Sequence, residues 1–149
     1  MELREFTSTD FAKYHPGGAL GKKLFLRVAD LARLNEKPLV KESATVKEVL
    51  VEITAKRLGT AAVVDVKGKI TGIITDGDIR TMLEKQDSVI SLTAIDIMGS
   101  NPKIIEAGEL AINALEKMRQ NNISQLLVIN EGVYAGVIHL HDLIREGII

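Results

Sequence analysis

The sequence predicts an α/β protein made of two copies of one unit, packed sheet to sheet with pseudo-two-fold symmetry. Residues 72–79 (GIITDGDI) return as residues 136–143 (GVIHLHDL), and residues 53–65 align with residues 118–130. The one-residue difference in length falls in a turn, where hairpin loops tolerate it. Each copy has the order helix, strand, strand, helix. A single copy would leave one face of a small sheet uncovered, so we expect the two copies to form an internal dimer.

The first repeat opens with a predicted amphipathic helix, because apolar residues recur at helical spacing after residues that favour N-caps. Two strands follow at residues 61–64 and 69–74, joined by a turn that contains Gly68. Asp76 or Asp78 is expected to cap the closing helix. The expected caps of the first helix are Ser43 and Thr45, and the expected core positions of the two helices are Val46, Val49, Leu50, Ile53, Ile79, Met82 and Leu83.

The second repeat follows the same order. Strands are predicted at residues 125–129 and 133–138, with a closing helix from about Leu140. The prolines at Pro38 and Pro102 mark an extended entry to each repeat, since the residue before a proline is kept out of the α region. The expected apolar face of the first helix of this repeat is Leu110, Ala111, Ala114, Leu115 and Met118.

Composition limits the classes of function. The chain has 149 residues, of which 46% are hydrophobic, so it suits one domain or two tightly packed halves. The net charge of −1, dispersed basic residues and 3% aromatics argue against partners such as nucleic acid or an anionic membrane. The chain contains no cysteine, which excludes disulfides and thiolate metal sites. No apolar run approaches the roughly 20 residues of a membrane span. We expect a cytoplasmic protein without a cofactor.

The doubled Gly-aliphatic-aliphatic-polar-x-x-Asp motif resembles that of two cystathionine β-synthase (CBS) domains in tandem, a CBS pair or Bateman module. The resemblance covers about residues 28–149 and implies βαββα-type repeats. Residues 10–12 (DFA) and 15–22 (HPGGALGK) resemble the junction after the sugar isomerase domain of bacterial arabinose 5-phosphate isomerases. The expected organisation is therefore a remnant of that domain and linker at 1–26, a first CBS repeat at 27–91 and a second at 92–149.

The isomerase family interconverts ribulose 5-phosphate and arabinose 5-phosphate, which feeds synthesis of the sugar acid Kdo of lipopolysaccharide. His15 matches the histidine of the family's His-Pro-Gly-Gly motif, which implies a role as a base in the parent enzyme. We expect the chain to begin near the end of the isomerase domain. Without the rest of that site, proximity and orientation are lost, so we expect no isomerase activity from this chain alone.

Thr75 and Asp78 are the ligand candidates of the first repeat. The resemblance implies that the hydroxyl bonds a phosphate or ribose and that the carboxylate accepts hydrogen bonds from ribose hydroxyls. The alternative is that both side chains cap the following helix, a role that is compatible with ligand binding. Asp76 lies beside them in the turn. Thr60 and Gln125, at equivalent positions before the middle strands, are implied contacts to the base of a nucleotide.

The second repeat keeps the carboxylate at Asp142 but has His139 where the family usually has threonine or serine. A histidine can still donate to a phosphate, more strongly when protonated. His139, His141 and Asp142 also suggest a metal site, but a lone His-x-His at a strand-to-helix turn is a weak signal, and we favour ligand contact or a structural role. Lys56 and Arg57 either neutralise a phosphate or are exposed charges at a helix end.

Together these patterns predict a regulatory module that binds a nucleotide between its repeats and influences an attached isomerase domain. Adenine nucleotides such as AMP or ATP are the general ligands of the CBS family, and CMP-Kdo is the activated end product of the pathway. The alternative is an assembly element, a homo-oligomer that holds isomerase subunits together without sensing a ligand. No complete set of catalytic groups supports an enzyme.

Overall fold

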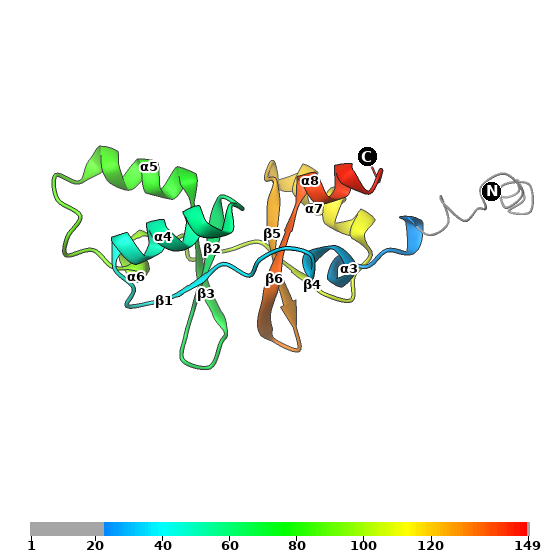
Figure 1. The fold of residues 1–149 in the computed structure, drawn as a ribbon, viewed down its shortest axis with the longest axis horizontal. Coiled ribbons are helices and arrows are strands. Elements are labelled where there is room, and N and C mark those ends of the chain that lie inside the picture. The colour runs from blue at the N-terminus through cyan, green and yellow to red at the C-terminus, as the bar shows by residue number, and fades with distance from the viewer. Residues whose placement is uncertain (1–22, 149) are drawn as a thin grey trace, which may run out of the picture.

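The structure, a computed structural model, describes residues 23–148. Two three-stranded sheets face each other in the centre, with helices on their outer sides (Figure 1). Most of the predicted 1–26 segment, including His15, lies outside the described residues. The elements are α3 (Val28–Ala32), β1 (Leu39–Lys41), α4 (Val46–Lys56), β2 (Thr60–Val64), β3 (Ile70–Thr75), α5 (Asp76–Lys85), α6 (Ala94–Ile97), β4 (Ile104–Glu106), α7 (Ala111–Asn121), β5 (Gln125–Asn130), β6 (Val133–His139) and α8 (Leu140–Arg145).

The two sheets have the same topology. β1 pairs parallel with β2, and β2 pairs antiparallel with β3; β4, β5 and β6 repeat this arrangement. Thr60 pairs with Thr75 at the end of the first hairpin, as Gln125 pairs with His139 at the end of the second. Each middle strand also has a register shift near its end. The expectation of two α/β repeats is confirmed.

The middle strands are buried on both faces, which is why β2 is a continuous run of small apolar residues. Since side chains alternate along a strand, Ala61 and Val63 face the helices of their own repeat, whereas Ala62 and Val64 face the other sheet. The cluster between the sheets confirms the expected sheet-to-sheet packing. Its buried members are Ala62, Val64, Leu127, Tyr134 and Val137.

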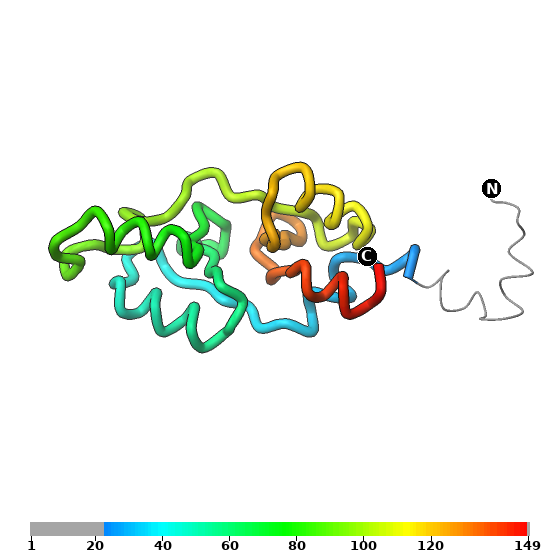
Figure 2. Tube along the Cα trace, turned by 90° about the horizontal axis from the view of Figure 1, so that it is seen from above, coloured from blue at the N-terminus to red at the C-terminus, as the bar shows by residue number. Residues whose placement is uncertain are grey.

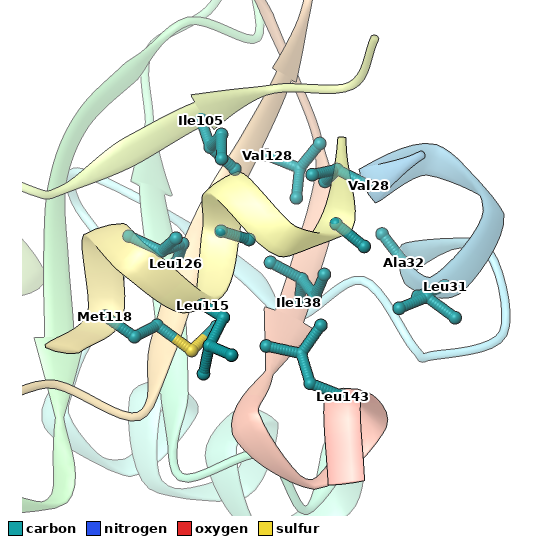
Figure 3. Close-up of a cluster of buried hydrophobic side chains, with 12 residues drawn as sticks. Val28, Leu31, Ala32, Ile105, Leu115, Met118, Leu126, Val128, Ile138 and Leu143 are labelled. Carbon is teal, nitrogen blue, oxygen red and sulfur yellow. The ribbon is translucent and has the colours of Figure 1, made fainter. Parts of the chain in front are cut away.

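The short helix before each repeat packs on the other repeat. Val28 and Leu31 of α3 belong to the core of the second repeat, beside Ile138 (Figure 3). Ala94 of α6 is buried in the core of the first repeat, and its N–H donates to the Ala44 carbonyl over 2.9 Å. The chain therefore crosses between the halves twice, which links them more firmly than the sheet contact alone.

Two details of the predicted first repeat are wrong. The N-cap of α5 is Thr75, not Asp76 or Asp78; Asp78 completes a capping box as the third helical residue. Leu50 and Leu83, expected in the core, are 39% and 59% exposed, because their helices bury only a narrow face. The described part of the chain has no helix of the length and apolar character that a membrane span requires.

Candidate functional site

A cleft of about 670 Å³ lies between the two repeats, where β3 meets α5 and β6 meets α8. It brings together most of the residues that the repeated motif singles out. Thr60 and Asp78 do not line it. The lining residues are Asn35, Arg57, Leu58, Gly59, Thr75, Asp76, Gly77, Asn122, Ile123, Ser124, Gln125, His139, His141, Asp142 and Arg145.

Thr75 and Asp78 form a reciprocal cap at the start of α5. The Thr75 N–H and hydroxyl donate to Asp78 Oδ2 over 2.9 and 3.1 Å, and the Asp78 N–H donates to the Thr75 hydroxyl over 3.2 Å. Asp78 faces a smaller cavity of about 190 Å³ between α5 and α6. The structure thus gives both residues the capping role, while only Thr75 also reaches the main cleft.

Thr60 is fully buried at the start of β2. Its hydroxyl donates to the Ile74 carbonyl over 3.1 Å across the hairpin, so its hydrogen-bonding capacity supports the sheet. Its counterpart Gln125 lines the cleft, where its Oε1 accepts a hydrogen bond from the Ser124 hydroxyl over 2.8 Å. The two equivalent positions therefore differ: only the one in the second repeat presents a polar side chain to the cleft.

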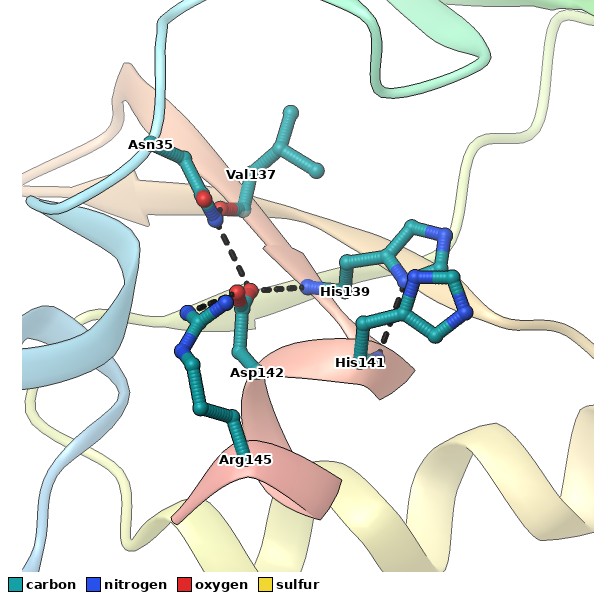
Figure 4. A network of polar contacts seen from close by, with 6 residues as sticks. All are labelled: Asn35, Val137, His139, His141, Asp142 and Arg145. Carbon is teal, nitrogen blue, oxygen red and sulfur yellow. Dashed lines mark hydrogen bonds and ion pairs between the residues drawn. The ribbon is translucent and has the colours of Figure 1, made fainter.

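Asp142 is the most connected polar side chain of the cleft, although it is only 2% exposed. Its Oδ2 accepts from the His139 N–H over 2.7 Å and from Asn35 Nδ2 over 2.8 Å (Figure 4). Its Oδ1 is 2.7 Å from the Arg145 guanidinium. Three donors compensate for the burial of this charge, which alone would be strongly unfavourable.

His139 occupies the N-cap position of α8 that Thr75 occupies in α5. Its Nδ1 accepts a hydrogen bond from the His141 N–H over 3.0 Å, and the two imidazole centroids are 4.3 Å apart. Burial, followed by the neighbouring His141, lowers the pKa of His139 against the opposing effect of Asp142. The cap requires an unprotonated Nδ1, so the neutral ring is the form that fits this fold.

Gly59 lines the cleft in a backbone conformation that favours glycine. A Cβ built at Gly59 would lie 3.2 Å from Asp76 Oδ2 and 3.9 Å from Gln125 Nε2, and Gly59 has a positive φ of 70°. Its carbonyl accepts from the Asp76 N–H over 3.1 Å. A side chain at this position would be strained by the positive φ and crowded by Asp76, whereas the distance to Gln125 of the other repeat is an ordinary contact.

Two arginine side chains, Arg57 and Arg145, line the cleft. Arg57, the C-cap of α4, lines it, whereas the adjacent Lys56 does not. Asn122 is the equivalent C-cap of α7, and both residues have left-handed backbone conformations, with φ of 61° and 53°. Arg145 adds a second guanidinium on α8. An anionic group would be stabilised between these arginines.

Sequence reasoning did not identify Asn35 or Arg145 as site residues. Arg145 follows Asp142 by three residues on one helix, so helical spacing is a signal that could have indicated the pair. Asn35 lies in the segment between α3 and β1, and no local pattern connects it with Asp142. Among residues 23–148 no group of three or more potential metal ligands was found.

The fold defines a module of two similar repeats with a cleft between them, and comparison with known families identifies its class. The CBS domain family model matches residues 28–85 and 94–148, so the chain belongs to the CBS domain family and carries two such domains. The expected resemblance to a CBS pair is confirmed.

The particular relatives are arabinose 5-phosphate isomerases, as the sequence predicted. The chain is 40% identical over 150 residues to arabinose 5-phosphate isomerase KdsD of Salmonella typhi, covering 100% of this chain and 46% of that protein. It is 41% identical over 143 residues to KpsF of Escherichia coli, covering 95% and 43%. The chain thus spans less than half the length of these curated relatives.

Solved structures agree on the fold. A CBS domain protein of Pyrobaculum aerophilum, solved in complex with AMP, has a TM-score of 0.71 at 26% identity, covering 79% of this chain and 90% of that one. A CBS domain structure from Sphaerobacter thermophilus has a TM-score of 0.73 at 19% identity, covering 92% and 96%. The second likeness shows the fold alone.

Proposed function

We propose that this chain is the regulatory module of an arabinose 5-phosphate isomerase, and that it binds a nucleotide or nucleotide sugar in the cleft between its repeats. The observation that carries this proposal is the composition of that cleft. Two guanidinium groups, from Arg57 and Arg145, share it with the polar side chains of Gln125 and His139. A phosphate, a sugar hydroxyl and a base would each find a partner of suitable chemistry.

Size supports the same class of ligand. The cleft volume of about 670 Å³ falls within the range of roughly 300–1,000 Å³ that is usual for small-molecule sites. The AMP complex of the Pyrobaculum aerophilum relative supports an adenine nucleotide, either AMP or ATP. The isomerase relatives support CMP-Kdo, an activated end product that carries phosphate, ribose and carboxylate groups.

Titration calorimetry of the chain with AMP, ATP, CMP and CMP-Kdo tests the proposal. Saturable binding of one nucleotide is the expected result, with a matching rise in the thermal unfolding midpoint because the ligand binds only the folded state. The absence of heat and of a thermal shift with all four compounds would contradict it. CMP-Kdo binding more tightly than CMP alone would identify the sugar acid as part of the recognised group.

One observation favours the alternative of an assembly element that does not sense a ligand. The Asp78 and Asp142 carboxylates both cap helices in the described structure, so the repeated aspartate has a structural explanation without any ligand. Under this alternative the chain self-associates and its thermal midpoint is unchanged by the four nucleotides. Sedimentation equilibrium with and without each nucleotide distinguishes the two functions.

A further inference from the structure

The segment that joins α3 to β1, residues 33–38, crosses from one half of the molecule to the other. It leaves α3, which packs on the second repeat, and enters β1 in the sheet of the first repeat (Figure 2). We call it the crossing segment. It is the covalent link between α3, which is held on the second repeat, and the sheet of the first repeat.

The crossing segment is attached to the second repeat at two points. Near its end, the Tyr134 hydroxyl donates to the Pro38 carbonyl over 2.7 Å, in the buried region between the sheets. In its middle, Asn35 Nδ2 donates to the Val137 carbonyl over 3.0 Å and to Asp142 Oδ2 over 2.8 Å. Only the Asn35 attachment lines the cleft, so a ligand there can reach it.

Asp142 has little remaining capacity to accept hydrogen bonds. A carboxylate offers about four acceptor positions, two on each oxygen. His139 and Asn35 both donate to Oδ2, which is therefore fully occupied, and Arg145 donates to Oδ1. The His139 N–H is fixed by the backbone at the start of α8, and Arg145 is a charged group on the same helix. Asn35 is the neutral donor that comes from a separate element, so it is the partner that can be displaced with least disruption.

We infer that Asn35 couples the cleft to the crossing segment: a ligand that donates a hydroxyl hydrogen bond to Asp142 Oδ2 displaces Asn35 from that oxygen and leaves the middle of the segment held by the Val137 contact alone. This inference rests on the proposed function and specifies its regulation. The exchange keeps Asp142 satisfied, because one donor replaces another. By linkage, any movement that pulls the segment away from the cleft favours ligand binding to the same extent.

Hydrogen exchange of the full 149-residue chain, followed by mass spectrometry on peptides covering residues 33–38, tests the coupling. Wild type is measured without ligand and with saturating AMP or CMP-Kdo, beside Asn35→Leu, which keeps similar volume without a donor. The control is Asn113→Leu on α7, which removes an exposed hydrogen bond from the Asn113 side chain to the Glu109 carboxylate. In the absence of ligand, Asn35→Leu is expected to speed exchange of the segment about tenfold or more, because it removes the hydrogen bonds to both Val137 and Asp142, while Asn113→Leu leaves it unchanged.

The ligand response separates coupling from simple structural support. Ligand is expected to speed exchange of the segment in wild type and in Asn113→Leu, and to add nothing in Asn35→Leu. If a ligand binds but the exchange of the wild-type segment is unchanged or slower, the inference is overturned while the proposed function stays intact. Failure of wild type to bind either compound would overturn both, and the wild-type comparison decides the matter even if a variant does not fold.

Discussion

Asn35 Nδ2 lies 2.8 Å from Asp142 Oδ2, although 107 positions separate the two residues in the chain. Asp142 is the aspartate of the repeated motif in the second repeat, and Asn35 lies in the crossing segment, outside any helix or strand. The contact places the segment between the halves beside the group that the motif marks in the second repeat. Its counterpart Asp78 receives hydrogen bonds only from Thr75 among the described residues, so the two motif aspartates have different surroundings.

The cleft arginine on α4 is expected to contribute to anion binding. Arg57→Gln removes a guanidinium from the cleft, and Lys56→Gln removes a neighbouring charge that does not line it. We expect Arg57→Gln to weaken AMP binding about tenfold, as fits a charge-assisted hydrogen bond worth about 1.5 kcal/mol. Lys56→Gln should change it less than about twofold, because Lys56 does not line the cleft and contributes only a screened charge from outside it. Calorimetry measures both, and equal effects would show that general charge, not the position of Arg57, attracts the ligand.

The two motif aspartates are expected to differ in their contribution to stability. Asp142→Asn places an amide among three donors and leaves the Arg145 contact without its carboxylate. We expect it to lower the free energy of unfolding by about 2 to 3 kcal/mol, because a buried charged network loses one member. Asp78→Asn keeps an oxygen for the Thr75 N–H and should cost about 1 kcal/mol. Urea denaturation measures both values, and a similar cost for the two variants would contradict the asymmetry.

The first motif glycine, Gly72, is required for packing, unlike Gly77, which is the second residue of α5. A Cβ at Gly72 would lie 2.8 Å from the Gly99 carbonyl oxygen and in closer contact with Met98, so Gly72→Ala forces the neighbouring backbone to move. We expect a loss of about 1 to 3 kcal/mol in the free energy of unfolding. A Cβ at Gly77 would meet only the Thr75 hydroxyl at 3.6 Å, so Gly77→Ala should be neutral or stabilise α5 by about 0.5 kcal/mol.

The same pair of variants also tests a binding role for Gly77. If a ligand approaches the backbone there, Gly77→Ala keeps its stability but loses affinity for AMP. Thermal unfolding and calorimetry on one preparation separate the two effects. A stable Gly77→Ala variant with wild-type affinity for AMP would show that Gly77 has no role in ligand binding.

Stability is expected to depend on pH through His139. Its pKa is lowered in the fold, chiefly by burial, so the unfolded chain binds more protons between the folded pKa and the usual value of about 6.5. The stability of the neutral form is therefore fully present above about pH 6.5 and decreases as the pH falls towards the folded pKa. His139→Thr, which copies the Thr75 cap, should reduce this dependence.

Unfolding midpoints of wild type and His139→Thr between about pH 7.5 and pH 5 measure this effect, because carboxylates common to both chains cancel in the difference. A wild-type midpoint that falls no faster than that of the variant would contradict it. An NMR titration of the His139 ring provides an independent measurement of the direction of the shift.

Most secondary structure followed from periodicity in the sequence. Helical spacing of apolar residues and apolar runs joined by turns correctly placed the four longer helices and the hairpin strands, and the repeated motif indicated two sheets in contact. The cap of α5 was misplaced because threonine and aspartate are both good N-caps, and only the hydrogen bonds distinguish their roles. Leu50 and Leu83 show that an apolar residue at the edge of a helical face is not necessarily buried.

The sequence by itself determined the family, the doubled architecture and the two strand-to-helix junctions, since these depend on local pattern and on a motif that recurs. Only the tertiary structure decided that α3 and α6 pack on the opposite repeats and that Thr60 and Asp78 face away from the main cleft. It alone brought Asn35 to Asp142. The physical reason is that contacts between distant residues depend on how whole elements pack, and neither periodicity nor local propensity specifies which element crosses to which half.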